Sequence, residues 1–199
     1  MAKQNDFKNM SYVGEFTYLD LYRPKKWNNI ARKYDTFDPE SGTGAYSISW
    51  TLDAKEAKSF EQTCMDHFES CKANSKKIGN FGKLHCMREN DDGTFLVTAK
   101  LNASNQFGVR RPVVVGKMMQ QMDDLDLWGG SKGAIKFSIS PQPNPSDNSH
   151  GISAYIQKIQ ITEPKYGEDD DGVFVREDEP ETAPSAAQES KLKDVALIT

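Results

Sequence analysis

The sequence predicts a mainly β protein: a small antiparallel β-barrel with one α-helix, followed by an acidic tail without fixed structure. Five to six segments alternate apolar and polar residues with a period of two, which is typical of half-buried strands. One amphipathic helix occurs early in the order, and strands do not alternate with helices, so a doubly wound sheet is disfavoured. The length of 199 residues suits one domain with a buried core plus some additional chain.

The first expected strand covers residues 15–21, where apolar and polar side chains alternate. Proline cannot donate a backbone hydrogen bond to a neighbouring strand, so Pro24 should end the pairing. Lys25, Lys26 and Trp27 would then lie in a basic loop with an exposed indole.

The clearest strand pattern covers residues 45–52. Its even-numbered residues share one apolar face: Tyr46, Ile48, Trp50 and Leu52. Asp53 then begins the sequence D-A-K-E, a capping box in which Asp53 and Glu56 satisfy the first backbone groups of a helix. The helix has an apolar stripe at three- and four-residue steps, formed by Ala57, Phe60, Cys64, Phe68 and Cys71. We expect this helix to cover one side of the sheet.

The remaining strands are separated by turn-forming and glycine-rich segments. They are expected at residues 94–103, 110–115, 134–140 and 152–161, with a glycine-dense bend at 127–133. In the last strand, strict alternation would place Ile156 and Ile159 on opposite faces. Residues 118–126 fit either a short helix or a loop.

The charge is divided unevenly along the chain. Residues 1–166 contain 22 Lys and Arg against 19 Asp and Glu, whereas residues 167–199 contain 3 against 10. The net charge of −4 therefore combines a mildly basic body with a strongly acidic tail. We expect two parts: a folded domain at 1–166, and a tail at 167–199 that cannot bury enough apolar surface to offset its ordering entropy.

Several functional classes are disfavoured by the sequence. No apolar run is long enough to span a membrane and no secretory signal precedes the domain, so a cytoplasmic protein is expected. Zinc could be held by Cys64, His67, Cys71, His85 and Cys86, but two of these cysteines lie on the apolar stripe and no C-x-x-C pair occurs. A phosphate-binding loop and a catalytic triad are also absent, so neither a cofactor nor an enzymatic activity is expected.

Single-stranded nucleic acid requires cations for its phosphates and aromatic faces for its unpaired bases. The body interleaves both. The candidate contacts are Lys25, Lys26, Trp27, Trp50, Lys76, Lys77, Phe81, Lys83, Lys100, Phe107, Arg110, Arg111, Lys132 and Lys136. Trp50 fits the barrel core equally well, and the lysines could be ordinary solvated surface. Arg110 and Arg111 beside Phe107 are the preferred contact, since a guanidinium group can both stack and bind phosphate.

Two segments carry a family resemblance: D-G-T-F at 92–95 and W-G-G-S-K-G-A-I-K-F-S-I-S-P at 128–141. With the order of elements and the acidic tail, the chain resembles the OB-fold single-stranded DNA-binding proteins of tailed bacteriophages. The OB-fold is a five-stranded barrel. The resemblance implies DNA contacts at Lys100 and Lys136. Two features depart from the family: Gln142 replaces an aromatic after the proline, and the sequence ends V-A-L-I-T rather than with an aromatic after the acids.

The resemblance implies a protein that binds and protects single-stranded DNA during phage replication, recombination or repair in a bacterial host. Phage or host replication and recombination proteins would be partners of the tail, and a homodimer is left open. The tail could be a solvated linker, or a tethered polyanion that competes with DNA for a basic cleft. The alternative function is a phage structural or adaptor module whose barrel binds a protein or glycan. Clustering of Lys100, Arg110, Arg111 and Lys136 on one face would favour DNA.

Overall fold

The computed structural model describes residues 6–122, 127–144, 147 and 149–166. The predicted tail at 167–199 lies outside the described residues, as does part of the ambiguous segment 118–126. Residues 118–122 form turns and an isolated bridge between Val115 and Gln121.

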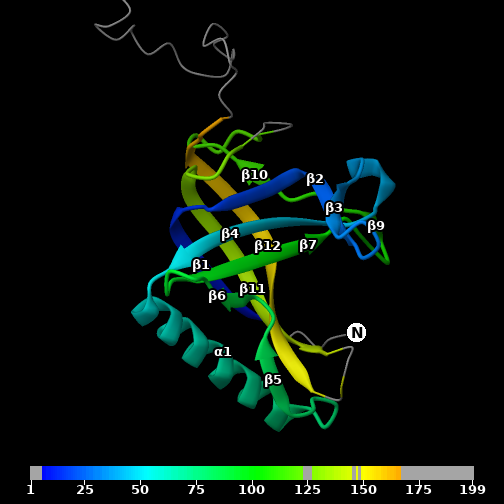
Figure 1. Ribbon diagram of the computed structural model, residues 1–199, viewed down its shortest axis with the longest axis vertical. Coiled ribbons are helices and arrows are strands. Elements are labelled where there is room, and N and C mark those ends of the chain that lie inside the picture. Colours follow the sequence, from blue (N-terminus) through cyan, green and yellow to red (C-terminus); the bar gives the residue numbers. More distant parts are fainter. Residues whose placement is uncertain (1–5, 123–126, 145–146, 148, 167–199) are drawn as a thin grey trace, which may run out of the picture. The chain divides into compact units, whose positions relative to one another are not determined.

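The described residues form a β-barrel with one long helix (Figure 1). Its long strands are β1 (Lys8–Glu15), β2 (Tyr18–Asn28), β4 (Ala45–Leu52), β7 (Phe95–Asn102), β11 (Lys132–Pro143) and β12 (His150–Glu163). Their order is β1-β11-β12-β7-β4-β2, and the two outermost strands of this list follow one another in the chain. With β1 and β2 counted as one bent strand, the result is the predicted five-stranded barrel. Only the β7–β12 pairing within this path is parallel.

The bend between β1 and β2 closes the barrel. The backbone amide of Phe16 donates to Ser131 on one side, and that of Thr17 donates to Ser49 on the other. The chain therefore leaves β11 and joins β4 within two residues. The expectation of one strand at 15–21 was wrong, because the corner lies inside that segment and the buried Phe16 fills it.

Short strands extend the edges of the barrel. They are β3 (Lys33–Thr36), β5 (Phe81–Leu84), β6 (Met87–Glu89), β8 (Ser104–Asn105), β9 (Gly108–Val109) and β10 (Val114–Val115), with a 3₁₀ turn η2 at Pro39–Ser41. The chain from β5 to β6 bridges β12 and β7: β5 pairs with β12, and β6 pairs with β7. The expected return strand at 110–115 is reduced to Val114 and Val115, which pair parallel with β12.

Pro24 does not end the second strand. β2 continues through it and pairs with β3 from Lys25 to Asn28, after a register shift between Asp20 and Lys25. Pro24 lies within this register shift, where its lack of a backbone amide hydrogen breaks no hydrogen bond between strands. Lys25, Lys26 and Trp27 therefore lie on a strand of a hairpin and not in a loop.

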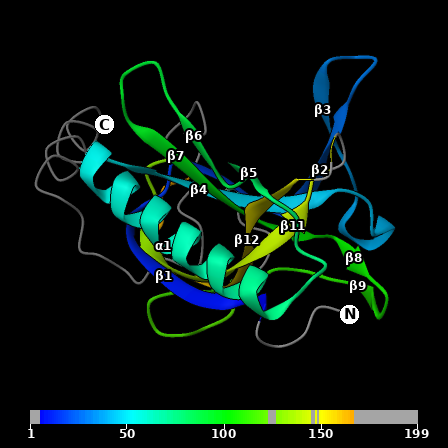
Figure 2. The same cartoon turned by 90° about the horizontal axis from the view of Figure 1, so that it is seen from below.

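Helix α1 (Ala54–Asn74) confirms the predicted capping box: the Asp53 carboxylate accepts from the Glu56 amide, and Glu56 accepts from the Asp53 amide. All five residues of the predicted apolar stripe are buried. The helix contacts β11, β4 and β5, and lies across the lower end of the barrel in Figures 1 and 2.

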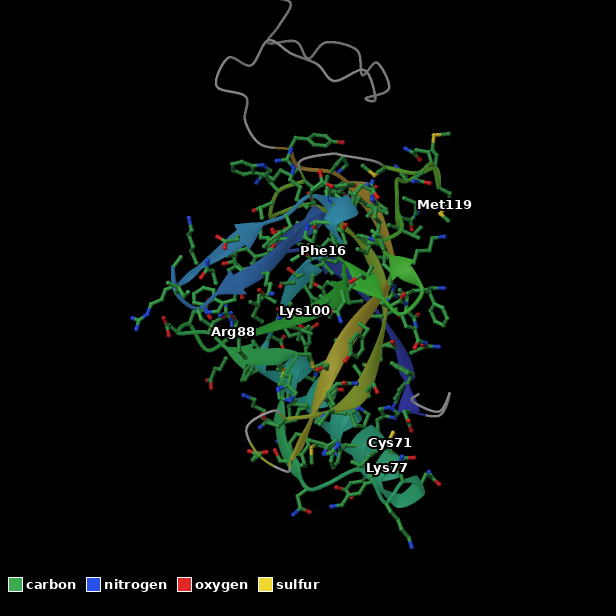
Figure 3. All side chains as sticks on the ribbon, turned by 90° about the vertical axis from the view of Figure 1, so that its right-hand side faces the viewer. Phe16, Cys71, Lys77, Arg88, Lys100 and Met119 are labelled. Carbon is green, nitrogen blue, oxygen red and sulfur yellow. The ribbon has the colours of Figure 1, made fainter. Side chains whose placement is uncertain are left out.

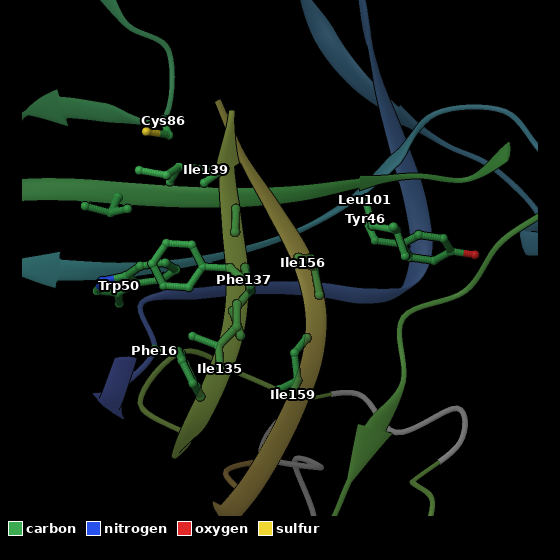
Figure 4. Packing of buried hydrophobic residues seen from close by; sticks show 14 of the residues in the cluster. Phe16, Tyr46, Trp50, Cys86, Leu101, Ile135, Phe137, Ile139, Ile156 and Ile159 are labelled. Atoms are coloured by element: carbon green, nitrogen blue, oxygen red, sulfur yellow. The ribbon is translucent and has the colours of Figure 1, made fainter. Parts of the chain in front are cut away.

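A β-bulge changes the faces of the last strand. Lys136 pairs with Lys158, but its neighbour Phe137 pairs with Ile156, so Gln157 is an extra residue on β12. Ile156 and Ile159 consequently both point into the core, which corrects the strict alternation expected from the sequence (Figure 4).

Candidate nucleic-acid interface

A groove of about 390 Å³ lies on the outer face of the barrel over β4 and β7. Successive side chains of a strand point to opposite faces, so the burial of Tyr46 and Ile48 directs Ser47 and Ser49 outward. From β7, Thr98 and Lys100 point to the same outer face and complete the floor. Lys100 is exposed.

The two walls come from segments distant in the sequence. One wall is the β2–β3 hairpin, which contributes Tyr18, Lys25 and Tyr34. The opposite wall is the bridge between β5 and β6, from His85 to Arg88. Figure 3 shows Arg88 and Lys100 in the same region of the surface. Three cations, Lys25, Arg88 and Lys100, therefore line one groove.

One acidic side chain, Asp20, is among the residues that line the groove. Its carboxylate accepts from the Lys25 ammonium at 2.5 Å and from the Ser47 hydroxyl at 3.3 Å. On the floor, the hydroxyls of Ser49 and Thr98 are 2.8 Å apart. Within the described ranges, neither Arg88 nor Lys100 forms an ion pair, so both charges are available to an anionic ligand.

Exposed aromatic rings stand on the hairpin wall. Trp27 and Tyr34 are cross-strand partners whose ring centres are 5.1 Å apart in an edge-to-face arrangement. Trp27 is 47% exposed, Tyr34 61% and Tyr18 57%. Such rings offer the flat faces on which unpaired bases stack.

The three predicted contacts at 25–27 lie on one strand, so their side chains point to two different faces. Lys25 and Trp27 are two residues apart and share the face of Tyr34, whereas Lys26 points away. The structure therefore brings Lys25 and Trp27 to the groove side, and not Lys26.

The second wall contains one histidine, His85. Its ring lies against Gly151, where an added Cβ would come within 2.4 Å of the imidazole. Burial, followed by the nearby positive charge of Lys83, lowers the pKa of His85 below its ordinary value. The imidazole is therefore neutral at pH 7 and lies on the wall of the groove.

The structure places Trp50 in the barrel core and not in the groove, which favours the core interpretation of this residue. It is 1% exposed, stacks against Tyr12 at 5.1 Å and packs beside Phe137 in the core (Figure 4). Its position on the inward face of β4, shared with Tyr46 and Ile48, determines this outcome.

Lys76 and Lys77 lie in the turn after α1, away from the residues that line the groove. Figure 3 shows Lys77 near the lower end of the molecule, distant from Lys100. Phe81 packs edge-to-face on Phe68 at 5.2 Å, so it belongs to the helix contact. Lys83 is exposed on β5, next to the groove wall.

Phe107, Arg110 and Arg111 lie on or beside the β8–β9 hairpin, beyond the end of β7. Phe107 is 84% exposed at its tip. Arg111 forms a salt bridge with Glu40 of the η2 turn. The preferred arginine pair therefore lies beyond one end of the groove, with one of its charges already paired.

Lys132 and Lys136 lie on β11, which β12 separates from β7 and Lys100. The Lys132 ammonium donates to Glu163 at 2.9 Å, and this contact raises the pKa of Lys132. Lys136 is directly opposite Lys158, and two like charges in register favour an anionic ligand between them. The anticipated cluster of Lys100, Arg110, Arg111 and Lys136 on one face is not formed.

Sequence reasoning missed Tyr18, Tyr34, Arg88 and Lys158. Tyr18 lies on β2 and Tyr34 on the short strand β3, and the pairing of these two strands is not visible in the sequence. Arg88 belongs to a three-residue strand, which is too short to show an alternating pattern in the sequence. Lys158 was missed because it lies opposite Lys136 only in the register that pairs β11 with β12.

Of the residues considered for zinc, the three cysteines are buried, whereas His67 is partly buried and His85 is exposed. Cys64 and Cys86 are buried, and a hydrogen bond between their side chains, with burial, raises the pKa of Cys64. The Cys71 thiol is 3.5 Å from His67. In the part of the chain that the structure describes, no group of three His, Cys, Asp or Glu side chains could hold a metal ion. Among the described residues, no helix is both long and apolar enough to cross a lipid bilayer.

Comparison by sequence finds no matching family model and no matching curated protein. Solved structures do match. The structure of gp2.5, a single-stranded DNA-binding protein encoded by bacteriophage T7, superposes with a TM-score of 0.52 and 20% identity, covering 89% of this chain and 100% of that one.

Two structures of the single-stranded DNA-binding protein from bacteriophage Enc34 match as well, both at 13% identity. The C-terminal truncation gives a TM-score of 0.53 and covers 82% of this chain and 92% of its own. The complex with single-stranded DNA gives 0.52 and covers 80% and 88%. At these identities the likeness establishes the fold, so the described chain has the barrel fold of phage single-stranded DNA-binding proteins.

Proposed function

We propose that this protein binds and protects single-stranded DNA in the groove over β4 and β7. The observation that carries the proposal is the composition of that groove: the cations Lys25, Arg88 and Lys100 with exposed aromatic rings on one wall. Cations for phosphates and rings for bases are the two requirements of single-strand binding. The shared fold with phage proteins of that activity supports it.

The same groove favours binding with little sequence preference. Sequence is read by hydrogen bonds to base edges, which need long polar side chains placed in a fixed array. The floor instead presents short hydroxyls, of which Ser49 and Thr98 bond to each other. Stacking on Tyr34 and Trp27 would accept any base, because every base has a flat face.

The biological setting follows from the resemblance. We infer that the protein acts in the cytoplasm of a bacterial host during phage DNA replication, recombination or repair. Its partners besides single-stranded DNA would be replication and recombination proteins that contact the acidic tail.

The tail at 167–199 would also regulate the groove. The tail carries a net charge of −7 and comes directly after the barrel in the sequence. A polyanion tethered in this way acts at a high effective concentration. It would occupy the cationic groove until DNA displaces it.

The test is a fluorescence titration with a single-stranded oligonucleotide and a duplex over a range of salt concentrations. Each phosphate contact on a single strand contributes about −0.7 to the log–log salt slope, so the two groove cations without an ion pair among the described residues, Arg88 and Lys100, predict a slope of about −1.4. Binding of the single strand without salt dependence, or no preference over the duplex, would contradict the proposal. Failure to bind DNA at all would favour the adaptor module.

A matched pair of lysine variants locates the site. Lys100→Ala should weaken single-strand binding and reduce the salt slope by about 0.7, because one phosphate contact is lost. Lys77→Ala removes the same charge from an exposed turn outside the groove and should change neither quantity. Equal effects of the two variants would show that net charge, and not the groove, determines affinity.

A further inference from the structure

A second cavity, the helix cleft, lies between the first half of α1 and the strands β1 and β4. Its volume is about 580 Å³, within the range of ligand pockets. Its apolar lining consists of Met10, Tyr12, Trp50, Leu52, Phe60 and Phe137. None of the residues lining it lines the DNA groove, so the two sites are separate.

The helix contacts β11, β4 and β5, and residues of β1, β4 and the first half of α1 line the cleft. In Figure 2 the strand β1 runs beside the helix. Tyr12 of β1 covers part of the floor by stacking on Trp50. Most of the apolar floor is buried, while Met10 and Tyr12 at its edge remain partly exposed and offer a contact to apolar side chains of a short peptide segment.

The rim of the helix cleft is predominantly acidic. Asp53 and Glu56 line it from the helix start, against the single cation Lys55. Glu15 lies at the other side: Tyr12 donates a hydrogen bond to its backbone carbonyl, and burial together with the charges of Glu56 and Glu15 raises the pKa of Tyr12. A complementary segment would combine apolar and basic side chains.

One segment of this chain has that composition. Residues 191–198 read K-L-K-D-V-A-L-I, with four large apolar side chains, two lysines and one acid. The stretch is therefore net positive within a tail of net charge −7 and holds two of the tail's three basic residues. Most of the acids precede it.

A series of contacts connects the last described residues to one side of the cleft. The Lys165 amide donates to Ser131, and the Ser131 carbonyl accepts from Phe16. The Phe16 ring is in turn 6.1 Å from that of Tyr12, which lines the cleft. A flexible chain of about 25 residues spans roughly 25–30 Å on average, so residues 191–198 can reach the cleft from Tyr166.

We propose that residues 191–198 bind in the helix cleft of the same molecule. Leu192 and the following apolar residues would cover the floor, and Lys191 and Lys193 would face Glu15, Asp53 and Glu56. Docking would anchor the tail at both ends and leave its acidic middle as a loop on the barrel. The proposal does not depend on DNA binding.

Paramagnetic relaxation in the full chain tests it. A nitroxide is attached at Thr199→Cys, since the three native cysteines are buried. We expect strong broadening of the amide signals of Tyr12, Lys55 and Ser59, and severalfold less in Leu192→Ser and Lys193→Glu. Phe174→Ser is the matched control, because it removes an apolar tail residue outside the segment and should leave the broadening intact.

Three results would overturn the proposal. The first is absence of broadening at the cleft in the unsubstituted tail. The second is equal loss in Phe174→Ser, which would indicate general apolar adhesion. The third is broadening that appears between a labelled chain and a separate isotope-labelled chain, which would make the occupant a second copy. The signals of all variants outside the cleft report whether the barrel remains folded.

Discussion

Trp50 and Trp27 lie on neighbouring strands of the barrel, yet only Trp27 is exposed to a ligand. Trp50 contacts Tyr12 and Phe137 in the core. Trp50→Ala would remove these contacts and leave a cavity, and should lower the free energy of unfolding by about 3–5 kcal/mol. Urea denaturation measures the change. A loss below the level typical of surface substitutions would contradict the assignment of Trp50 to the core.

Trp27→Ala should have the opposite profile. With its ring 47% exposed beside Tyr34, its loss should barely change the free energy of unfolding but weaken single-strand binding by about 1–3 kcal/mol, the range for one stacked base. Titration with a short oligothymidylate checks the affinity. Trp27→Phe keeps a stacking face and should retain most of the binding; equal loss in both variants would exclude stacking.

His85 should make DNA binding pH-dependent. Its lowered pKa keeps it neutral near pH 7, and protonation at lower pH adds a positive charge to the groove wall. Because bound phosphates favour the protonated form, affinity should rise as the pH falls from about 8 to about 5.5. His85→Gln should flatten this part of the profile. If His85→Gln leaves the pH dependence of affinity unchanged, other titratable groups cause it.

The same group affects folding with the opposite sign. A pKa lower in the folded than in the unfolded chain means that the unfolded chain binds the proton first. The stability that neutral His85 contributes is therefore present above its ordinary pKa of about 6.5 and is lost as the pH falls below it. Binding and stability measurements must accordingly be made on the same pH series.

At the scale of elements, the bulge on β12 determines which residues form the core. Gln157 is the extra residue, and it lets Ile156 and Ile159 face inward together. Deleting Gln157 would remove the bulge and restore strict alternation, in which Ile156, Ile159 and Ile161 still share the inward face. We therefore expect the deletion variant to keep its cooperative thermal unfolding transition, as followed by circular dichroism.

Gln157→Ala is the control for that deletion, because it keeps the bulge and loses only the exposed hydrogen bond to Asn9. Its free energy of unfolding should change by less than about 1 kcal/mol. Loss of the cooperative transition in the deletion variant, with the alanine variant unaffected, would contradict this prediction and show that the barrel requires the extra residue.

Elements with local signals were predictable. β4 and α1 carry their periodicity and capping box within a short stretch, and both have nearly the predicted bounds. Elements that depend on a distant partner were not. Pro24 lies within β2 because β3 supplies the pairing beyond it, and the bulge appears only when β12 is aligned with β11. The site shows the same division, since Lys25 and Lys100 were predicted while Arg88 and Tyr34 are positioned by tertiary pairing.

On the scale of the whole molecule, the two sites lie on different surfaces of one strand. The outward residues of β4 form the floor of the groove, and its inward residue Trp50 lies at the floor of the helix cleft. One rigid strand thus positions a cationic groove and an apolar cleft with an acidic rim. The tail has a segment suited to each: an acidic stretch at 168–181 and the basic, apolar stretch at 191–198.

Removal of the tail should therefore tighten DNA binding. A chain ending at Tyr166 lacks the competing charge of −7 and should bind a single strand roughly tenfold more tightly at low ionic strength, with the difference shrinking as salt screens both interactions. Gel shifts with single-stranded and duplex DNA measure it. A full-length variant with Asn and Gln in place of the acids at 168–179 separates charge from chain length and should reproduce the tightening. Unchanged or weaker binding in both variants would exclude competition and leave the tail as a linker or a site for partners.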